Sequence, residues 1–267
     1  MKKIIYSDLD GTLFDYNEQG SFVSDKNIEA INSWTNNNYF GIATGRNILS
    51  VKKLFENTKL NINLPFVLTN GACVYDFKND EIIYKKPISK LVIDEAIKYI
   101  KKKPIAILLL ITPEGRYYVG KFDENIFNRP NFDFAEINEN EIDYNDIVKI
   151  DFMVNPNNNE ELTKDIKNFK NIDLFSIVPS SLRYVELISN EASKYQGIKK
   201  ALEHIKINDY KLFTIGDYLN DYEMLLNANV AFAPSNAHEK IKNIAHHIVK
   251  THKEHAIFEM IQFINKL

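Results

Sequence analysis

Short apolar runs that end in polar residues recur in the first and last parts of this 267-residue chain. Nearly every position in each run is apolar, which is typical of strands buried on both faces. The runs cover residues 4–6, 39–43, 65–68 and 212–215, and the polar residues that follow them include Asp8, Thr44, Asn70 and Asp217. The pattern therefore predicts four buried strands, each with a polar residue at its carboxyl end.

Stretches with the periodicity of amphipathic helices separate these runs. The apolar positions spaced for one helix face are Ile28, Ile31 and Trp34 in one stretch, and Ile198, Ala201, Leu202 and Ile205 in another. Strands that alternate with helices predict an α/β fold with a doubly wound, Rossmann-like parallel sheet. Ligands of such sheets lie outside the carboxyl ends of the strands, so the polar residues are expected to converge there.

The middle of the chain interrupts this alternation and is richer in strands. The expected strands are residues 81–84, 105–111, 116–119, 149–154 and 183–188, and the expected helices are 90–101 and 160–169. In the first helix, Leu91, Ala96 and Ile97 are spaced for burial, and the acidic segment 123–146 is expected to be loop with at most one short helix. The chain is thus predicted to have a core domain, residues 1–80 and 189–267, with a smaller α/β domain, residues 81–188, inserted into it.

The run Asp8-Leu9-Asp10-Gly11-Thr12 places two carboxylates at the end of the first predicted strand. Like charges this close raise the pKa of at least one carboxyl unless a cation lies between them. Gly11 allows a sharp turn, and the hydroxyl of Thr12 adds a polar group. One aspartate could attack an electrophile while the other transfers a proton, although a simple turn rich in Asp and Gly remains an alternative.

Four motifs, taken in order, resemble those of the haloacid dehalogenase-like phosphatases. They are the run from Asp8 to Thr12, then Thr44-Gly45-Arg46, then Lys194, and finally Gly216-Asp217-Tyr218-Leu219-Asn220-Asp221. The flanking Thr69-Asn70-Gly71-Ala72 and Ser235-Asn236-Ala237 are similar to the Cof-type branch, which carries a class IIB cap after the third core strand. The resemblance implies that residues 81–188 form this cap.

The resemblance also implies the chemical roles of the acidic residues. Asp8 would be the nucleophile that forms an aspartyl-phosphate, and Asp10 the general acid and base. A Mg²⁺ ion would be bound by a carboxylate oxygen of Asp8, the backbone carbonyl of Asp10 and the carboxylate of Asp217, an all-oxygen set that suits this cation. Asp221 would orient a water molecule on the metal.

Thr44, the Gly45 N–H, Lys194 and Asn220 would bind the phosphate and substrate, and Asn70 would support the site from a turn. Alternatives remain open at several of these positions. Lys194 could be a solvated lysine at a helix start, and the segment from Thr44 to Arg46 could be a helix N-cap, with Arg46 in a structural role. The lysine segment also departs from the family, because Tyr195 and Gln196 stand before Gly197.

The function expected is a Mg²⁺-dependent phosphatase that hydrolyses small phosphorylated metabolites such as sugar phosphates. One alternative is a phosphotransferase or phosphomutase of the same fold, in which a sugar hydroxyl accepts the phosphoryl group. Another is a non-catalytic phospho-receiver, but its acceptor aspartate would follow a middle strand and its chain would be about half as long.

Composition narrows the class of partner. A net charge of −3 gives no attraction to nucleic acid or anionic membranes, so neither is expected as a partner. The partner that the resemblance implies is a small phosphate ester. The single Cys73 excludes an internal disulfide and is expected to be a buried filler in a reducing compartment. The chain starts directly with a predicted strand and its longest apolar run is 105–111, so a cytoplasmic location is expected. A monomer and a dimer are both compatible with the sequence.

Overall fold

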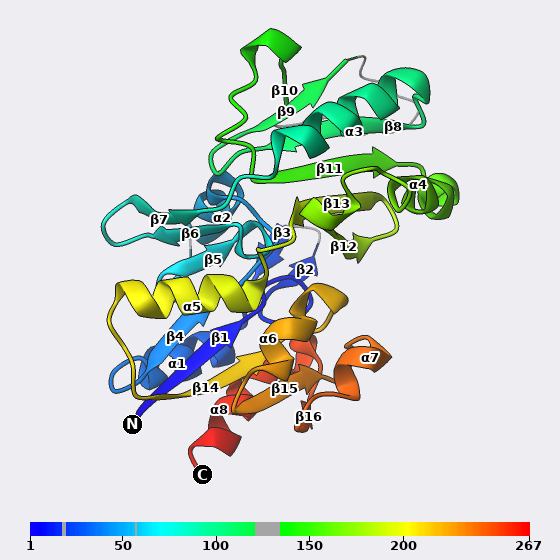
Figure 1. The fold of residues 1–267 in the computed structure, drawn as a ribbon. Helices are drawn as coiled ribbons and strands as arrows, with labels where there is room; N and C mark the ends of the chain where they lie inside the picture. Colours follow the sequence, from blue (N-terminus) through cyan, green and yellow to red (C-terminus); the bar gives the residue numbers. More distant parts are fainter. Residues whose placement is uncertain (18–19, 57, 121–133) are drawn as a thin grey trace. The chain divides into compact units, whose positions relative to one another are not determined.

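The computed structural model describes residues 1–17, 20–56, 58–120 and 134–267. The chain divides into two compact units, each visible in Figure 1: unit 1 is Met1–Tyr84 with Ser193–Leu267, and unit 2 is Lys85–Ala192. The sequence places the divisions after residues 80 and 188 instead. The strand predicted at 81–84 was assigned to the inserted domain, but it extends a small sheet of unit 1.

The main sheet of unit 1 has five parallel strands in the order β16-β15-β14-β1-β4. Their bounds are β1 (Lys2–Ser7), β4 (Tyr39–Ile42), β14 (Tyr210–Ile215), β15 (Val230–Pro234) and β16 (His247–Val249). Ser7 pairs with Ile42 on one side and Ile215 on the other, so the chain leaves β1, β4 and β14 at one edge of the sheet. The predicted convergence of polar residues follows from this register.

Two smaller sheets complete the strands of unit 1. A three-stranded sheet contains β5 (Phe66–Leu68), β6 (Cys73–Asp76) and β7 (Glu81–Lys85), and a hairpin contains β2 (Asp15–Asn17) and β3 (Gly20–Phe22). A single parallel bridge between Ala43 and Val67 connects β5 to the end of β4. Cys73 is fully buried in β6, as predicted.

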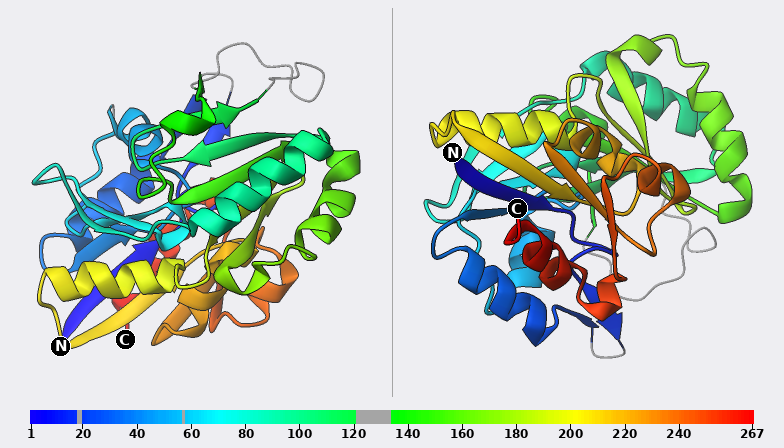
Figure 2. Two further views of the ribbon diagram at one scale, coloured as in Figure 1. Left: turned by 45° about the horizontal axis from the view of Figure 1, so that its top comes forward. Right: turned by 90° about the horizontal axis from the view of Figure 1, so that it is seen from below.

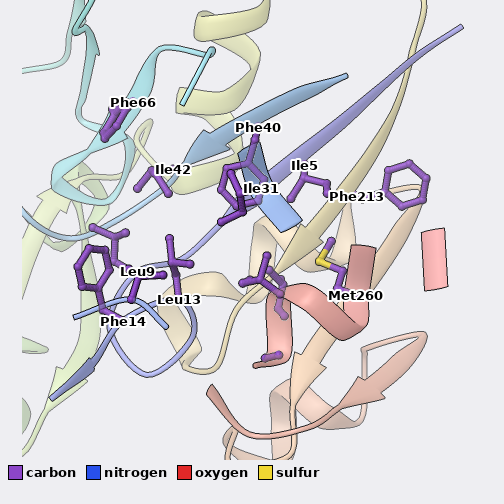
Figure 3. Packing of buried hydrophobic residues seen from close by; sticks show 14 of the residues in the cluster. Ile5, Leu9, Leu13, Phe14, Ile31, Phe40, Ile42, Phe66, Phe213 and Met260 are labelled. Atoms are coloured by element: carbon purple, nitrogen blue, oxygen red, sulfur yellow. The ribbon is translucent and has the colours of Figure 1, made fainter. Parts of the chain in front are cut away.

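Helices cover both faces of the main sheet, which confirms the doubly wound fold. One face packs against α1 (Asp25–Trp34), α2 (Ile48–Phe55) and α8 (Ala256–Ile264), and the other against α5 (Lys194–His204), α6 (Tyr222–Leu226) and α7 (Glu239–Lys242). Figure 2 shows α5 and α8 on opposite sides of the sheet. On the first face, Ile5 of β1 joins a cluster with Ile31 and Met260 (Figure 3). Its neighbours Ile4 and Tyr6 point to the other face, as strand alternation requires.

Unit 2 is a second α/β unit with a six-stranded sheet in the order β10-β9-β8-β11-β13-β12. The strands are β8 (Ala106–Ile111), β9 (Arg116–Val119), β10 (Ala135–Glu136), β11 (Lys149–Val154), β12 (Phe175–Ser181) and β13 (Tyr184–Ser189). Its helices are α3 (Lys90–Lys102) and α4 (Asn159–Ile166), and both pack on the same face. The predicted strands and helices are all present, but β12 was not predicted, because serine and proline interrupt its apolar pattern.

Two details of unit 2 differ from the prediction or lie beyond it. Leu91 is 58% exposed, so its predicted burial is wrong; the buried face of α3 is instead formed by Val92, Ile93, Ala96, Ile97 and Ile100. Of the predicted loop 123–146, residues up to 133 lie outside the described residues, and the remainder contains β10 and a 3₁₀ turn at Glu139–Glu141.

A bilayer-crossing helix would need a long apolar stretch, and none of the helices in the described residues has one.

Candidate active site

A buried lysine joins two aspartates at the carboxyl edge of the main sheet. Lys194 is the first residue of α5, its side chain is fully buried, and its ammonium lies 2.6 Å from Oδ1 of Asp8 and 2.5 Å from Oδ1 of Asp221. The alternative of a solvated surface lysine is therefore wrong. The second oxygen of Asp8, Oδ2, has no hydrogen-bond partner among the described residues. A carboxylate that is held by one oxygen can attack an electrophile with the other.

Asp217 and Thr12 lie beside this group. The hydroxyl of Thr12 donates to Oδ1 of Asp217 over 3.3 Å. Gly11 has φ +81°, and a Cβ there would lie 2.5 Å from Oδ2 of Asp217, so only glycine fits this turn. Asp221 accepts hydrogen bonds through Oδ2 from the N–H groups of Asp217 and Tyr218, at 2.9 and 3.1 Å. Asp221 thus orients both the lysine and the loop that carries Asp217.

The electrostatics of the site reflect burial and crowding. Burial raises the pKa of Asp8 well above its usual value; Lys194 opposes this rise, and the neighbouring aspartates add to it. Burial likewise raises the pKa of Asp217 to about 7, with Asp221 adding to the rise and Lys194 opposing it. Burial alone would lower the pKa of Lys194, but the two carboxylates that it contacts raise it overall, so its ammonium is charged. Among the described residues, Lys194 is thus the cation in contact with a group of three carboxyl groups, those of Asp8, Asp217 and Asp221, so the group has more acidic side chains than cations.

The carboxylates fit a divalent cation. Asp8, Asp217 and Asp221 each offer an oxygen within 4.8 Å of the others, and these are the hard ligands that Mg²⁺ or a similar ion prefers. The carboxylates of Asp8 and Asp217 were predicted as ligands. That of Asp221, which was predicted to act through water, is already engaged by Lys194 and two N–H groups.

Asn70 connects two of the predicted phosphate-binding loops. Its Oδ1 accepts from Nδ2 of Asn220 over 3.1 Å, and its N–H donates to the carbonyl of Thr44 over 2.9 Å. Asn70 has a left-handed backbone, with φ 55°, as does Thr69 before it, with φ 48°. Such strain in residues other than glycine persists only where the surrounding structure imposes it. The loop geometry thus brings Thr44 and Asn220 to the same region.

The segment from Thr44 to Arg46 is not the helix N-cap that was considered. Asn47 caps α2, since its side chain accepts from the N–H of Ser50. Thr44 is buried and its hydroxyl oxygen accepts from the N–H of Arg46 over 3.3 Å, which leaves its proton available to a ligand.

Sequence reasoning missed two features of the site. Arg46, for which only a structural role was favoured, contacts the carboxylate of Asp10 through both Nε and a terminal nitrogen. Gly71, with φ +91°, lies so close to Ser193 that a Cβ would clash with its carbonyl oxygen. This close approach positions the start of α5 and therefore Lys194. The only signal for it in the sequence is the glycine itself.

Comparisons with known proteins agree with the fold and the motifs. The sequence pattern of the haloacid dehalogenase-like hydrolases matches residues 5–261. Phosphatase YwpJ of Bacillus subtilis is 27% identical, over 98% of this chain and 99% of its own. The structure of a HAD/COF-like hydrolase from Plasmodium vivax superposes with a TM-score of 0.84 and 26% identity, covering 99% of this chain and 96% of the other.

A subclass IIB sugar phosphatase of the same superfamily has a TM-score of 0.81 at 20% identity, with both chains covered completely, which is a likeness of fold. The predicted resemblance to the Cof-type branch is thereby confirmed. The chain belongs to the haloacid dehalogenase-like hydrolase family and is an enzyme of its phosphatase class.

Proposed function

We propose that this enzyme is a Mg²⁺-dependent phosphatase that hydrolyses small phosphorylated metabolites through an aspartyl-phosphate on Asp8. The observation that carries the proposal is the environment of Asp8, which Lys194 holds by one oxygen while the other oxygen is free to attack. The phospho-receiver alternative does not fit an enzyme of a hydrolase family.

In the first step, Oδ2 of Asp8 attacks phosphorus and the ester P–O bond breaks, with its electron pair going to the leaving oxygen. Asp10, which must be protonated at the start of this step, gives that oxygen its proton. In the second step, water attacks the aspartyl-phosphate while Asp10 takes a proton from the water, and inorganic phosphate leaves with Asp8 regenerated. Asp10 therefore regains in the second step the proton that it gave in the first.

The phosphate requires positioning and charge neutralisation more than covalent chemistry. The ammonium of Lys194, the hydroxyl of Thr44, the N–H of Gly45 and the amide of Asn220 are proposed to bind its oxygens. Lys194 is well suited because Asp8 and Asp221 fix its ammonium beside the nucleophile. Asn70 fixes the orientation of Asn220 by accepting from its amide.

The carboxylates of Asp8 and Asp217, with the backbone carbonyl of Asp10, are proposed to bind the Mg²⁺ ion. When bound, the ion would neutralise charge on the phosphate and screen the carboxylates from each other. The hydrogen bond from Thr12 fixes Oδ1 of Asp217 within this set.

We also propose that unit 2 is the cap and selects the ester. The catalytic groups all lie in unit 1, so unit 2 is available for this task. Sugar phosphates or similar phosphomonoesters are the proposed substrates, since a superfamily member with this fold is a sugar phosphatase. The polar-tipped residues of unit 2 that are proposed to contact the ester are Arg116, Tyr117, Arg183 and Tyr184, and alanine variants test them. Each should change kcat/KM for the best ester more than for p-nitrophenyl phosphate.

The decisive experiment is a panel of phosphate esters assayed with Mg²⁺, using wild type and Asp8→Asn. Wild type should release phosphate from at least one sugar phosphate, and Asp8→Asn should not. Adding a sugar acceptor and analysing the products distinguishes hydrolysis from phosphoryl transfer to a hydroxyl. Equal phosphate release by both proteins would contradict the proposed mechanism.

A further inference from the structure

The carboxylate of Asp10 is held by a two-point contact that the motifs do not assign. Nε of Arg46 donates to Oδ2 of Asp10 over 2.8 Å, and a terminal nitrogen of Arg46 donates to Oδ1 over 2.7 Å. A planar guanidinium that binds both oxygens fixes the carboxylate in position and in rotation. A single-point contact from a lysine would leave the rotation free.

Arg46 is itself fixed at several points. Its N–H donates to the hydroxyl oxygen of Thr44, and its carbonyl accepts from the N–H of Thr69 over 2.9 Å. The same terminal nitrogen that binds Asp10 also donates to the hydroxyl of Tyr16 over 2.9 Å. Tyr16 lies in the β2–β3 hairpin, so the guanidinium is anchored both to the loop after β4 and to this hairpin.

The backbone of Asp10 is also constrained. The carbonyl of Leu9 accepts from three N–H groups in the turn after β1, those of Thr12, Leu13 and Phe14. With the backbone fixed, the remaining freedom of Asp10 lies in its side-chain torsions, and these are what the guanidinium restrains. The pair is part-exposed, with 30% of the Arg46 side chain and 40% of the Asp10 side chain accessible. The pair therefore contributes little to the stability of the fold, and its main effect is to fix the orientation of the Asp10 carboxylate.

We infer that Arg46 is the positioning residue of Asp10. When Asp10 is protonated for the first step, its carbonyl oxygen still accepts from Arg46, and this contact directs its O–H toward the leaving oxygen, so Arg46 acts on proton transfer and not on binding of the phosphate. The inference rests on the proposed function. Proton transfer matters most for esters whose leaving oxygen is a poor leaving group, such as an alkyl alcohol. An ester with a good leaving group, such as p-nitrophenyl phosphate, needs little help from a general acid.

The test compares wild type, Arg46→Ala, Arg46→Lys, Asp10→Asn and the double variant Asp10→Asn/Arg46→Ala on an alkyl phosphate and on p-nitrophenyl phosphate. Arg46→Ala should lower kcat for the alkyl ester by about 100-fold, the usual scale for misplacing a catalytic group, and by less than about 5-fold for the aryl ester. Arg46→Lys keeps the positive charge but not the planar guanidinium, so its kcat for the alkyl ester should lie between those of wild type and Arg46→Ala. Inhibition by inorganic phosphate should not change.

The double variant separates a role through Asp10 from any other role. If Arg46 acts through Asp10, removing it in the Asp10→Asn background should lower kcat by no more than about 3-fold. Lys52→Ala is the matched control, because it removes an ion pair with Asp80 from the surface of α2. It should leave both esters unaffected.

The outcomes distinguish the two proposals. A wild type that hydrolyses no ester overturns the proposed function and the role of Arg46 with it. If wild type is active but Arg46→Ala slows both esters equally, or the double variant falls far below Asp10→Asn, the role of Arg46 alone is overturned. If circular dichroism shows that Arg46→Ala does not fold, the two esters are compared with Arg46→Lys instead.

Discussion

Replacing Lys194 by methionine removes a cation that contacts both Asp8 and Asp221 while keeping a side chain of similar length. The ammonium lies 2.6 and 2.5 Å from the two carboxylates, and its side chain is fully buried. Removing one partner of a buried ion pair typically lowers stability by about 3–5 kcal/mol, because the remaining charge is left uncompensated. For a chain of this size that corresponds to a fall in Tm of about 6–20 °C.

The assay is thermal denaturation followed by circular dichroism in buffer without divalent cations, since a bound cation would offset the lost charge. Lys52→Met is the control, because it makes the same substitution at an exposed pair and should change stability by no more than about 0.5 kcal/mol. Adding Asp221→Asn to Lys194→Met should recover part of the loss, since it removes one of the unpaired charges. A Tm for Lys194→Met within the range of the control would refute this account of the site.

Three further results are expected. Asp8→Asn should lower kcat by at least about 10³-fold and leave the protein folded, because it removes the attacking charge and also relieves repulsion; far-UV circular dichroism and turnover measure both. Chelation should abolish activity and Mg²⁺ restore it, while Ca²⁺ should inhibit because its looser coordination misplaces the phosphate; full activity in excess chelator would contradict the proposed metal. In unit 2, burial raises the pKa of Asp151 to about 6, with Lys149 opposing the rise and Glu186 adding to it. Folded protein then binds more protons than unfolded protein between about pH 4 and 6, so the free energy of unfolding falls as pH rises through that window. Asp151→Asn should therefore raise the Tm at pH 7.5, where the gain in the free energy of unfolding is at most about 3 kcal/mol, and it should have much less effect at pH 4. An equal change in Tm at pH 7.5 and pH 4 would contradict this prediction.

The sequence predicted those parts of the fold in which buried positions follow a regular pattern of apolar residues. The runs before Asp8, Thr44 and Asp217 are buried strands, and the parallel register of β1, β4 and β14 brings their ends to one edge. Periodicity failed where the pattern was ambiguous. Leu91 lies beside the buried face of α3 rather than on it, and β12 contains the polar and proline residues that obscure a strand.

The parts that sequence could not predict are contacts between distant side chains. A lysine at a helix start has the same local pattern whether it is solvated or buried, and only the close approach of Gly71 to Ser193 places Lys194 inside. The contact of Arg46 with Asp10 spans 36 positions and depends on how two loops are wound. Neither loop has a periodic pattern from which its path could be predicted.

The balance of charges at the carboxyl edge of the main sheet bears on whether the protein needs the metal to fold. The carboxylates of Asp8, Asp10, Asp217 and Asp221 outnumber the cations of Lys194 and Arg46 by two, which is the charge of one divalent ion. Lys194 already compensates the two carboxylates that are most deeply buried, Asp8 and Asp221. Asp10 is paired with Arg46 near the surface, and Asp217 is held by a neutral hydroxyl. Two negative charges therefore lack a cation: one remains on Asp8 and Asp221, which share Lys194, and the other is on Asp217. The raised pKa of Asp8 and of Asp217 allows protons to neutralise part of this charge when no ion is bound. We therefore expect the chain to fold without the metal and to gain only a modest rise in Tm from Mg²⁺, because the ion would mainly serve the charge that the phosphate brings.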